Sequence, residues 1–118
     1  MKRFMAVFTG STAARERSGW DQLNETDRRA REQKGLEAWG AWVEKHKASI
    51  IDNGAPLGKT KRAGLNGVTD ISNNLAVYLV VQADSHDAAA KLFEGHPHFT
   101  IFPGEAVEIM ECLAVPNG

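Results

Sequence analysis

The sequence predicts an α+β fold in which helices cover one face of an antiparallel β-sheet. Its clearest strand is residues 75–83 (LAVYLVVQA), which contain no charged residue and are rich in Val, Leu and Tyr. Side chains alternate between the two faces of a strand. The odd-numbered positions from Leu75 to Ala83 form a wholly apolar face, whereas the even positions include Tyr78 and Gln82. We expect this strand inside the sheet, with helices on its apolar face and a partner sheet or a pocket on the other.

A long helix predicted over residues 24–47 supplies much of this cover. Asn24 is a typical N-cap residue, and acidic residues follow in the first turn. Spacings of three and four residues produce a broad apolar stripe: Leu36, Trp39, Val43 and His46, with Gly35, Ala38 and Trp42 on the adjacent row. Both tryptophans are predicted to be core side chains. Because glycine lowers helix propensity by about 1 kcal/mol, Gly35 and Gly40 suggest close packing on the sheet.

The other predicted elements are shorter. They are strands at residues 3–9, 49–52, 67–71 and 106–114, and a second helix from the cap residue Ser85 to Gly95, where Pro97 prevents continuation. Residues 11–24 show no periodicity and are predicted to form a loop anchored by Trp20. Residues 53–56 (NGAP) should turn or bulge the strand before them. The basic segment 58–66 is predicted to be exposed.

The order of elements, β-α-β-(β)-β-α-β, is that of a ferredoxin-like sandwich. Two helices cover one face of such a sheet and leave the other open. The open face would carry several apolar side chains: Met5, Val7, Tyr78, Val80 and Met110. An exposed apolar face of this kind needs a cover, and a second copy of the same sheet is the simplest one. We therefore predict a homodimer with two-fold symmetry.

Composition limits the class of protein. The 118 residues suit a single domain, residues 1–118, with a substantial core. A formal net charge of −1 gives no overall field that would attract nucleic acid or an anionic membrane. The single cysteine, Cys112, excludes an intrachain disulfide and a cysteine-cluster metal site. Because no apolar run is long enough for a signal sequence or a membrane span, we expect a cytoplasmic protein.

Five features occur in a characteristic order along the chain. They are residues 54–57 (GAPL), 68–70 (VTD), the tyrosine-bearing strand 75–83, the strand-to-helix junction 83–89 (ADSHDAA) and residues 107–109 (VEI). Together they resemble the YCII-related family, including its DGPF-type branch, within the dimeric α/β-barrel superfamily. The resemblance covers residues 1–115. It implies a ferredoxin-like domain that pairs with a second copy into a dimeric α/β barrel.

The resemblance also bears on chemistry. The family often has Val-x-Asp-Gly-Pro-Phe before its central strand; here Asp70 matches the aspartate, while Ile71-Ser72-Asn73 replace the residues after it. Some relatives are thought to use a His–Asp pair with the histidine early on the first helix, where this chain has Glu37 and its neighbours. The dyad therefore does not carry over, and the resemblance implies no particular substrate.

Residues 53–60 (NGAPLGKT) are close to a phosphate-binding P-loop. Asn53, however, stands where that motif needs glycine. Residues 61–67 contain two glycines and do not predict the helix whose N-terminus would hold the phosphate. We therefore interpret the segment as a turn.

Residues 95–99 (GHPHF) form the cluster of greatest chemical interest. If the backbone is extended there, His96 and His98 point the same way, as an acid/base pair or two metal ligands would. A metal would need a third ligand, which nothing in the sequence identifies, and ring packing in a loop is the alternative. Because apolar residues flank His98, burial can tune its pKa. We predict His98 as the functional histidine, rather than His46 at a helix end or His86 facing solvent.

The final strand adds a carboxylate. Val107 and Ile109 should face the helices, so that Glu108, Met110 and Cys112 face the open side. A carboxylate in a partly apolar cavity has a raised pKa and can act as general acid or base. The alternative is a carboxylate at the rim, paired with a basic side chain. Cys112 is interpreted as a small buried hydrophobe.

Two functional hypotheses follow. The first is an enzyme that performs proton transfer or elimination on a small organic compound, without a cofactor, in a cavity at the open sheet face. Its candidate catalytic residues are His98, His96, Glu108 and Asp70, and its candidate ligand-binding residues are Tyr78, Gln82, Met110 and Asp52. The second is a non-catalytic protein that binds a metabolite or serves in dimer assembly. We expect no metal, cofactor, nucleic acid or membrane partner.

Overall fold

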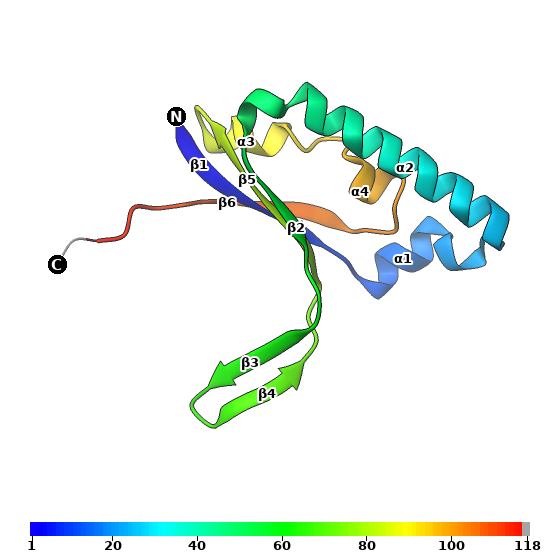
Figure 1. Ribbon diagram of the computed structural model, residues 1–118, viewed down its shortest axis with the longest axis horizontal. Coiled ribbons are helices and arrows are strands. Elements are labelled where there is room, and N and C mark those ends of the chain that lie inside the picture. Colours follow the sequence, from blue (N-terminus) through cyan, green and yellow to red (C-terminus); the bar gives the residue numbers. More distant parts are fainter. Residues whose placement is uncertain (117–118) are drawn as a thin grey trace.

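The computed structural model describes residues 1–116 and shows an antiparallel sheet with helices on one side (Figure 1). The strands are β1 (Lys2–Thr9), β2 (Ile50–Pro56), β3 (Thr60–Gly64), β4 (Gly67–Ile71), β5 (Leu75–Ala83) and β6 (Ala106–Glu111). The helices are α1 (Thr12–Ser18), α2 (Glu25–Lys45), α3 (His86–Lys91) and α4 (Pro97–Thr100), with 3-10 turns η1 (Trp20–Gln22) and η2 (Lys47–Ser49). The main sheet has the order β2-β5-β1-β6, and β3 and β4 form a separate hairpin. This α+β architecture confirms the predicted fold class.

β5 lies between β2 and β1, as its apolar sequence predicted. The helix-facing side of the sheet forms the core together with α2 and the α3 region: Phe4, Ala6, Phe8, Trp42, Leu79, Val81, Ala83, Ala89 and Phe93 are buried. On the other face, Val80 pairs with Met5 of β1, and Met5 is also opposite Met110 of β6. The two faces of β5 therefore have the different environments that its alternation predicted.

α2 is the main helix covering the sheet. The Asn24 side chain caps it by accepting a hydrogen bond from the backbone N–H of Asp27 at 2.8 Å, so the predicted start is confirmed. The Trp42 indole N–H donates to the carbonyl of Leu92 at 2.8 Å, which ties α2 to the segment after α3. A Cβ at Gly35 would lie 2.5 Å from the ring of Phe102, so this glycine is closely packed, against the segment after α4. A Cβ at Gly40 would meet no atom within 4 Å, so the close packing on the sheet predicted for Gly40 is wrong. No helix within residues 1–116 is long and apolar enough to cross a membrane.

The prediction of a loop over residues 11–24 is wrong, because α1 and η1 form there. The Ser11 hydroxyl caps α1 by accepting a hydrogen bond from the backbone N–H of Ala14 at 3.0 Å. Ala14 is the only buried residue of α1, so the helix has no apolar stripe that periodicity could detect. Trp20 is buried against Phe102, with ring centroids 5.9 Å apart, which confirms its anchoring role.

Several boundaries differ from prediction. β2 does not end at Asp52 but continues through a bulge to Pro56. α3 ends at Lys91, and single turns follow before Gly95 adopts a left-handed backbone. Pro97 does not end the helical path; it takes the first position of α4, where its missing N–H is harmless. β6 ends at Glu111, short of the predicted Ala114. Cys112 follows the strand and is exposed, so its interpretation as a buried hydrophobe is wrong.

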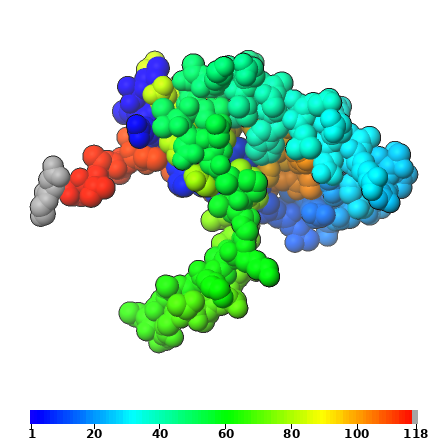
Figure 2. All heavy atoms as spheres, in the orientation of Figure 1, coloured from blue at the N-terminus to red at the C-terminus, as the bar shows by residue number. Residues whose placement is uncertain are grey.

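β3, β4 and their flanks form an arm, residues 57–75, that leaves the body of the molecule (Figures 1 and 2). Residues 58–66 are exposed except for the half-buried Thr60, in agreement with the prediction. β4 coincides with the predicted strand 67–71 but pairs with β3 rather than with the main sheet. A strand rather than a helix follows Lys59, in agreement with the interpretation that this segment is not a P-loop.

Candidate functional site

The two histidines of residues 95–99 are buried on the helix-covered side of the sheet. His96 is the N-cap of α4, and its Nδ1 accepts a hydrogen bond from the backbone N–H of His98 at 3.0 Å. Nε2 of His98 donates to the carbonyl of Thr9 on β1 at 2.8 Å. The extended backbone considered from the sequence is not formed, because Pro97 begins a helical turn.

These hydrogen bonds fix the positions of the ring protons. A carbonyl oxygen can only accept, so His98 carries its proton on Nε2. Nδ1 of His96 accepts an N–H, so His96 also carries its proton on Nε2. That atom is buried and has no hydrogen-bond partner within the described chain. An aromatic shell surrounds the His96 ring at centroid distances of 4.5 to 6.1 Å: Phe8, Trp39, Trp42 and Phe93.

Burial makes both rings difficult to protonate. The pKa of His96 is lowered from 6.5 to about 3, chiefly by loss of hydration and then by the proximity of His98 and His46. Burial also lowers the pKa of His98, while the hydrogen bond to Thr9 opposes that shift. At neutral pH both side chains are therefore uncharged imidazoles. Nδ1 of His96 already accepts the backbone N–H of His98, whereas Nδ1 of His98 accepts no hydrogen bond within residues 1–116.

The structure does not bring the histidines together with the predicted carboxylates in one chain. Glu108 lies on the opposite face of the sheet, paired with Val7 of β1. Asp70 lies on the arm, where it forms an ion pair with Lys61 at 2.7 Å. The predicted grouping of His98 or His96 with these carboxylates is therefore not formed. Within residues 1–116, no group of three or more His, Cys, Asp or Glu side chains is placed to hold a metal ion.

The open face of the sheet carries the predicted ligand-binding side chains. They are Asp52 on β2, Tyr78 and Gln82 on β5, and Met110 on β6, with Glu108 beside them. Tyr78 and Glu108 flank Val7 from its two neighbouring strands. Asp52 has a local structural contact, because its Oδ1 accepts the backbone N–H of Gly54 at 2.8 Å. Alternation therefore assigned Tyr78, Gln82, Glu108 and Met110 to the same face correctly. The histidines, which were predicted to share that cavity, lie on the other side of the sheet.

A pocket of about 420 Å³ opens on the helix-covered side, between α2 and one end of β2 and β5. Its walls are Leu36, Trp39, Gly40 and Val43 of α2, residues 53–56 of β2, Val77 and Leu79 of β5, and Phe102. None of these side chains is ionisable, and Asn53 and the indole of Trp39 supply the polar groups. Trp39 also contacts the histidine pair, with its ring centroid 4.5 Å from that of His96. The pocket therefore suits a largely apolar ligand, with the histidines behind Trp39.

This pocket was not predicted from the sequence. Helical spacing assigns Trp39 and Trp42 equally to the core, and that is confirmed only for Trp42, whereas Trp39 is half-buried in the pocket wall. The sequence contained one signal of the pocket, because Gly40 follows Trp39 within the apolar part of α2. In the structure, a Cβ at Gly40 would meet no atom within 4 Å. Together with the 57% exposure of Leu36, this indicates that α2 extends beyond the sheet surface that it covers.

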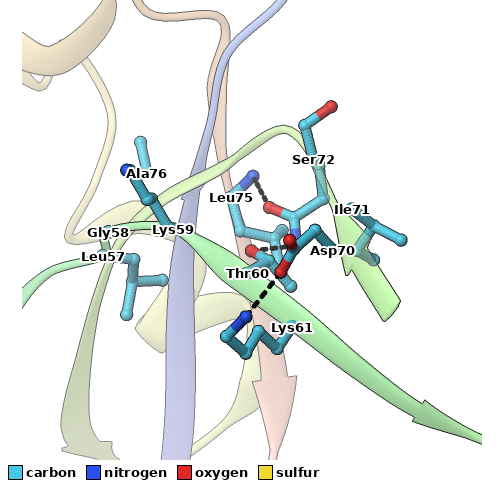
Figure 3. Close-up of a pocket in the computed structure, with 11 residues that line it drawn as sticks. Leu57, Gly58, Lys59, Thr60, Lys61, Asp70, Ile71, Ser72, Leu75 and Ala76 are labelled. Atoms are coloured by element: carbon cyan, nitrogen blue, oxygen red, sulfur yellow. Dashed lines mark hydrogen bonds and ion pairs between the residues drawn. The ribbon is translucent and has the colours of Figure 1, made fainter. Parts of the chain in front are cut away.

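A larger cavity, of about 1060 Å³, lies where the arm joins the sheet (Figure 3). Lys61 and Asp70 form their ion pair across the hairpin, and the Asn73 side chain donates to the Thr60 hydroxyl at 3.1 Å. Lys61, Asp70 and Asn73 are exposed, so water weakens these contacts. The cavity is the concave side of the arm, and its lining includes exposed charged side chains, unlike the apolar walls of the pocket beside α2.

No protein-family model matches this sequence, and no curated protein matches it. A solved structure does match: the 5-chloro-2-hydroxyhydroquinone dehydrochlorinase TftG from Burkholderia phenoliruptrix AC1100, in complex with 2,5-dihydroxybenzoquinone. The TM-score is 0.50 at 18% sequence identity, and the match covers 98% of this chain and 95% of TftG. An identity this low shows a shared fold. The α+β fold expected from the sequence is confirmed, while membership of the dimeric α/β-barrel superfamily and of the YCII-related family stays a prediction.

Proposed function

We propose that this chain is a small-molecule enzyme whose substrate, a planar and largely apolar ring compound, binds in the pocket between α2 and the sheet. The pocket carries the proposal: its volume of about 420 Å³ and its aromatic and aliphatic walls are those of a small-molecule site. TftG, a dehydrochlorinase of the same fold seen with a dihydroxybenzoquinone, supports this class of ligand. The site is thus proposed on the helix-covered side instead of the open face.

The chemistry that we propose is proton transfer or elimination without a cofactor, with His98 as general base. The hydrogen bond from Nε2 to Thr9 leaves the electron pair of Nδ1 to accept a proton. Because burial lowers the pKa of His98, the ring is unprotonated at neutral pH and ready to act as a base. His96 would position His98 through its hydrogen bond to the backbone. Trp39 must turn aside for a bound ring to reach His98, and Glu108 and Asp70 take no part in this step.

Ligand binding without catalysis is the second candidate function. It is favoured by one observation, that none of the pocket-lining side chains is ionisable. A ring compound can therefore be held there with no acid or base in direct contact. The two candidates share the pocket and differ in the role of His98.

Titration with a panel of phenols, hydroquinones and quinones, followed by tryptophan fluorescence, tests the pocket. Gly40→Leu should fill it from α2 without a clash, because a Cβ at this position meets no atom within 4 Å. Since overfilling a packed site typically costs about 1–3 kcal/mol, we expect affinity to fall at least about tenfold. Ala41→Leu, on the exposed side of the same helix, is the matched control and should bind like the wild type. Equal affinities of the two variants would place the ligand elsewhere.

His98→Gln separates catalysis from binding. The glutamine amide can still donate to the carbonyl of Thr9, but it cannot serve as a base. For a ring compound that wild type converts, we expect binding to remain and the rate to fall by about 10²–10⁴-fold. An unchanged rate would show that His98 is not the base. Tight binding without turnover of any panel compound by wild type would favour the binding protein.

We also propose that two chains pair through their open sheet faces. The chain exposes 8318 Å², whereas a compact monomer of 12.9 kDa exposes about 6,300 Å². The excess of roughly 2,000 Å² per chain is large enough for a stable protein–protein interface. In such a dimer, Asp52, Tyr78, Gln82, Glu108 and Met110 would line the space between the sheets.

Val80→Lys should convert a dimeric wild-type protein into a monomer or an insoluble chain. Val80 is half-buried on the open face beside Met5, so a lysine there would place an unpaired charge inside the interface. Sedimentation equilibrium measures the change, and Ala30→Lys on the exposed side of α2 serves as the control. A dimer that Val80→Lys leaves intact would show that the interface lies elsewhere.

A further inference from the structure

Almost none of the arm is buried against the rest of its own chain. Every residue from 61 to 75 is exposed, including Leu65, Val68 and Ile71 at 107%, 66% and 40%. A two-stranded hairpin alone is at best marginally stable in water. The register of β3 and β4 is nevertheless regular from Thr60 opposite Ile71 to Gly64 opposite Gly67. An ordered arm with exposed apolar side chains indicates a binding surface outside this chain.

The position of the arm favours a partner at the open face. Figure 1 shows the helices on one side of the sheet and the arm extending away on the other, and Figure 2 shows the arm standing clear of the body. The radius of gyration is 16.4 Å, whereas a compact chain of 118 residues has about 13.5 Å. The arm thus extends beyond the edge of its own sheet, on the side of the open face.

The charge of the arm complements the far edge of the sheet. Residues 57–66 contain Lys59, Lys61 and Arg62 and no acidic residue, whereas residues 105–112 contain three glutamates and no basic residue. Lys61 is paired with Asp70, while Lys59 and Arg62 form no ion pair within residues 1–116. The arm leaves from the β2 and β5 side of the sheet, and β6 is the opposite edge.

We propose that the arm is a clasp for a second copy of this chain, an inference that rests on the proposed homodimer. A two-fold axis parallel to the strands puts the β2 edge of each sheet over the β6 edge of the other. Each arm then lies along the partner's β6, with Lys59 and Arg62 facing the partner's Glu108 on the open face. The base of the arm then lies over the start of the partner's β6, because Leu75 and Ala106 both lie opposite Thr9, at the same end of the sheet.

An armless variant tests the clasp directly. Residues 59–73 are removed and Gly58 is joined to Asn74. The new turn is short because the backbone N–H of Leu57 already donates to the carbonyl of Ala76 at 2.8 Å. Circular dichroism and thermal melting verify the fold, and sedimentation equilibrium gives the dimer Kd. We expect the Kd to rise at least about tenfold, since the lost contacts include charge pairs and apolar area.

A charge variant tests the contact with β6 in the intact arm, where the substitutions are exposed and far from the core. Lys59→Glu with Arg62→Glu should raise the dimer Kd by about tenfold or more at low salt. Mixing this variant with Glu108→Lys should restore association through mixed dimers. Lys34→Glu with Lys45→Glu on α2 makes the same change in net charge and should leave the Kd unaltered.

The outcomes separate the two proposals. If Val80→Lys abolishes the dimer while the armless variant keeps the wild-type Kd, the clasp is wrong and the sheet-face dimer stands. If the armless variant dimerises weakly but the charge variants and their mixture behave like wild type, the arm does not contact the partner's β6. A wild-type protein that is monomeric at all concentrations overturns the dimer, and the clasp with it.

Discussion

Replacing Gly54 with alanine is expected to lower the free energy of unfolding by about 3 kcal/mol or more. Gly54 has a φ of +59°, in the left-handed region that residues with a Cβ rarely adopt. A Cβ there would also lie 1.7 Å from the carbonyl oxygen of Tyr78, which belongs to the backbone of β5 and cannot rotate away. Relief requires β2 to separate from β5 at the bulge. The same movement would deform the pocket, whose wall includes Gly54.

Urea unfolding at a fixed protein concentration measures this effect, because a dimer makes apparent stability concentration-dependent. Gly58→Ala is the matched control, since it lies just after β2 and a Cβ there would meet no atom within 4 Å. We expect the control to remain within about 0.5 kcal/mol of wild type. A loss below about 1 kcal/mol for Gly54→Ala would contradict the close approach of the two backbones.

The bulge at Gly54 also illustrates what a sequence reveals about a fold. Residues 53–56 were predicted to turn or bulge the chain because glycine and proline punctuate strands. The strand continues beyond the bulge because β5 provides a ladder on which it can pair again, a contact made by residues distant in the sequence. β5 and α2 were predicted well because each has the apolar period of its own secondary structure. α1 was missed because capping by Ser11, and not burial, determines where it forms.

The candidate site was less predictable because it depends on which side of the sheet each segment enters. Alternation correctly assigned Tyr78 and Glu108 to the open face. No periodicity governs residues 95–99, so the α4 turn that carries His96 and His98 beneath α2 could not be inferred from spacing. Their apolar neighbours did indicate a dry environment, and the lowered pKa of His98 agrees with that expectation. Sequence thus predicted the environment of the histidines better than their position.

Acidification should destabilise this protein through His96. In the unfolded chain the imidazole titrates near 6.5, whereas burial in the aromatic shell lowers the pKa of the folded state to about 3. Above pH 6.5 neither state binds the proton. As the pH falls from 6.5 towards 3, the unfolded state binds it and the folded state does not, so the free energy of unfolding decreases. The slope approaches about 1.4 kcal/mol per pH unit, and the total loss is on the order of 5 kcal/mol.

His98 and His46 act in the same direction, because burial also lowers the pKa of each ring. His96→Asn isolates the contribution of His96: asparagine is a good N-cap that can still accept the N–H of His98, and it does not titrate. Urea unfolding at pH 7.5, 6, 5 and 4 should show a steeper loss of stability for wild type than for His96→Asn. NMR of the wild type should show the His96 ring still neutral at pH 5. Parallel stability curves, or a His96 ring that titrates near 6.5 in the folded protein, would show that His96 is not enclosed by Phe8, Trp39, Trp42 and Phe93 in solution.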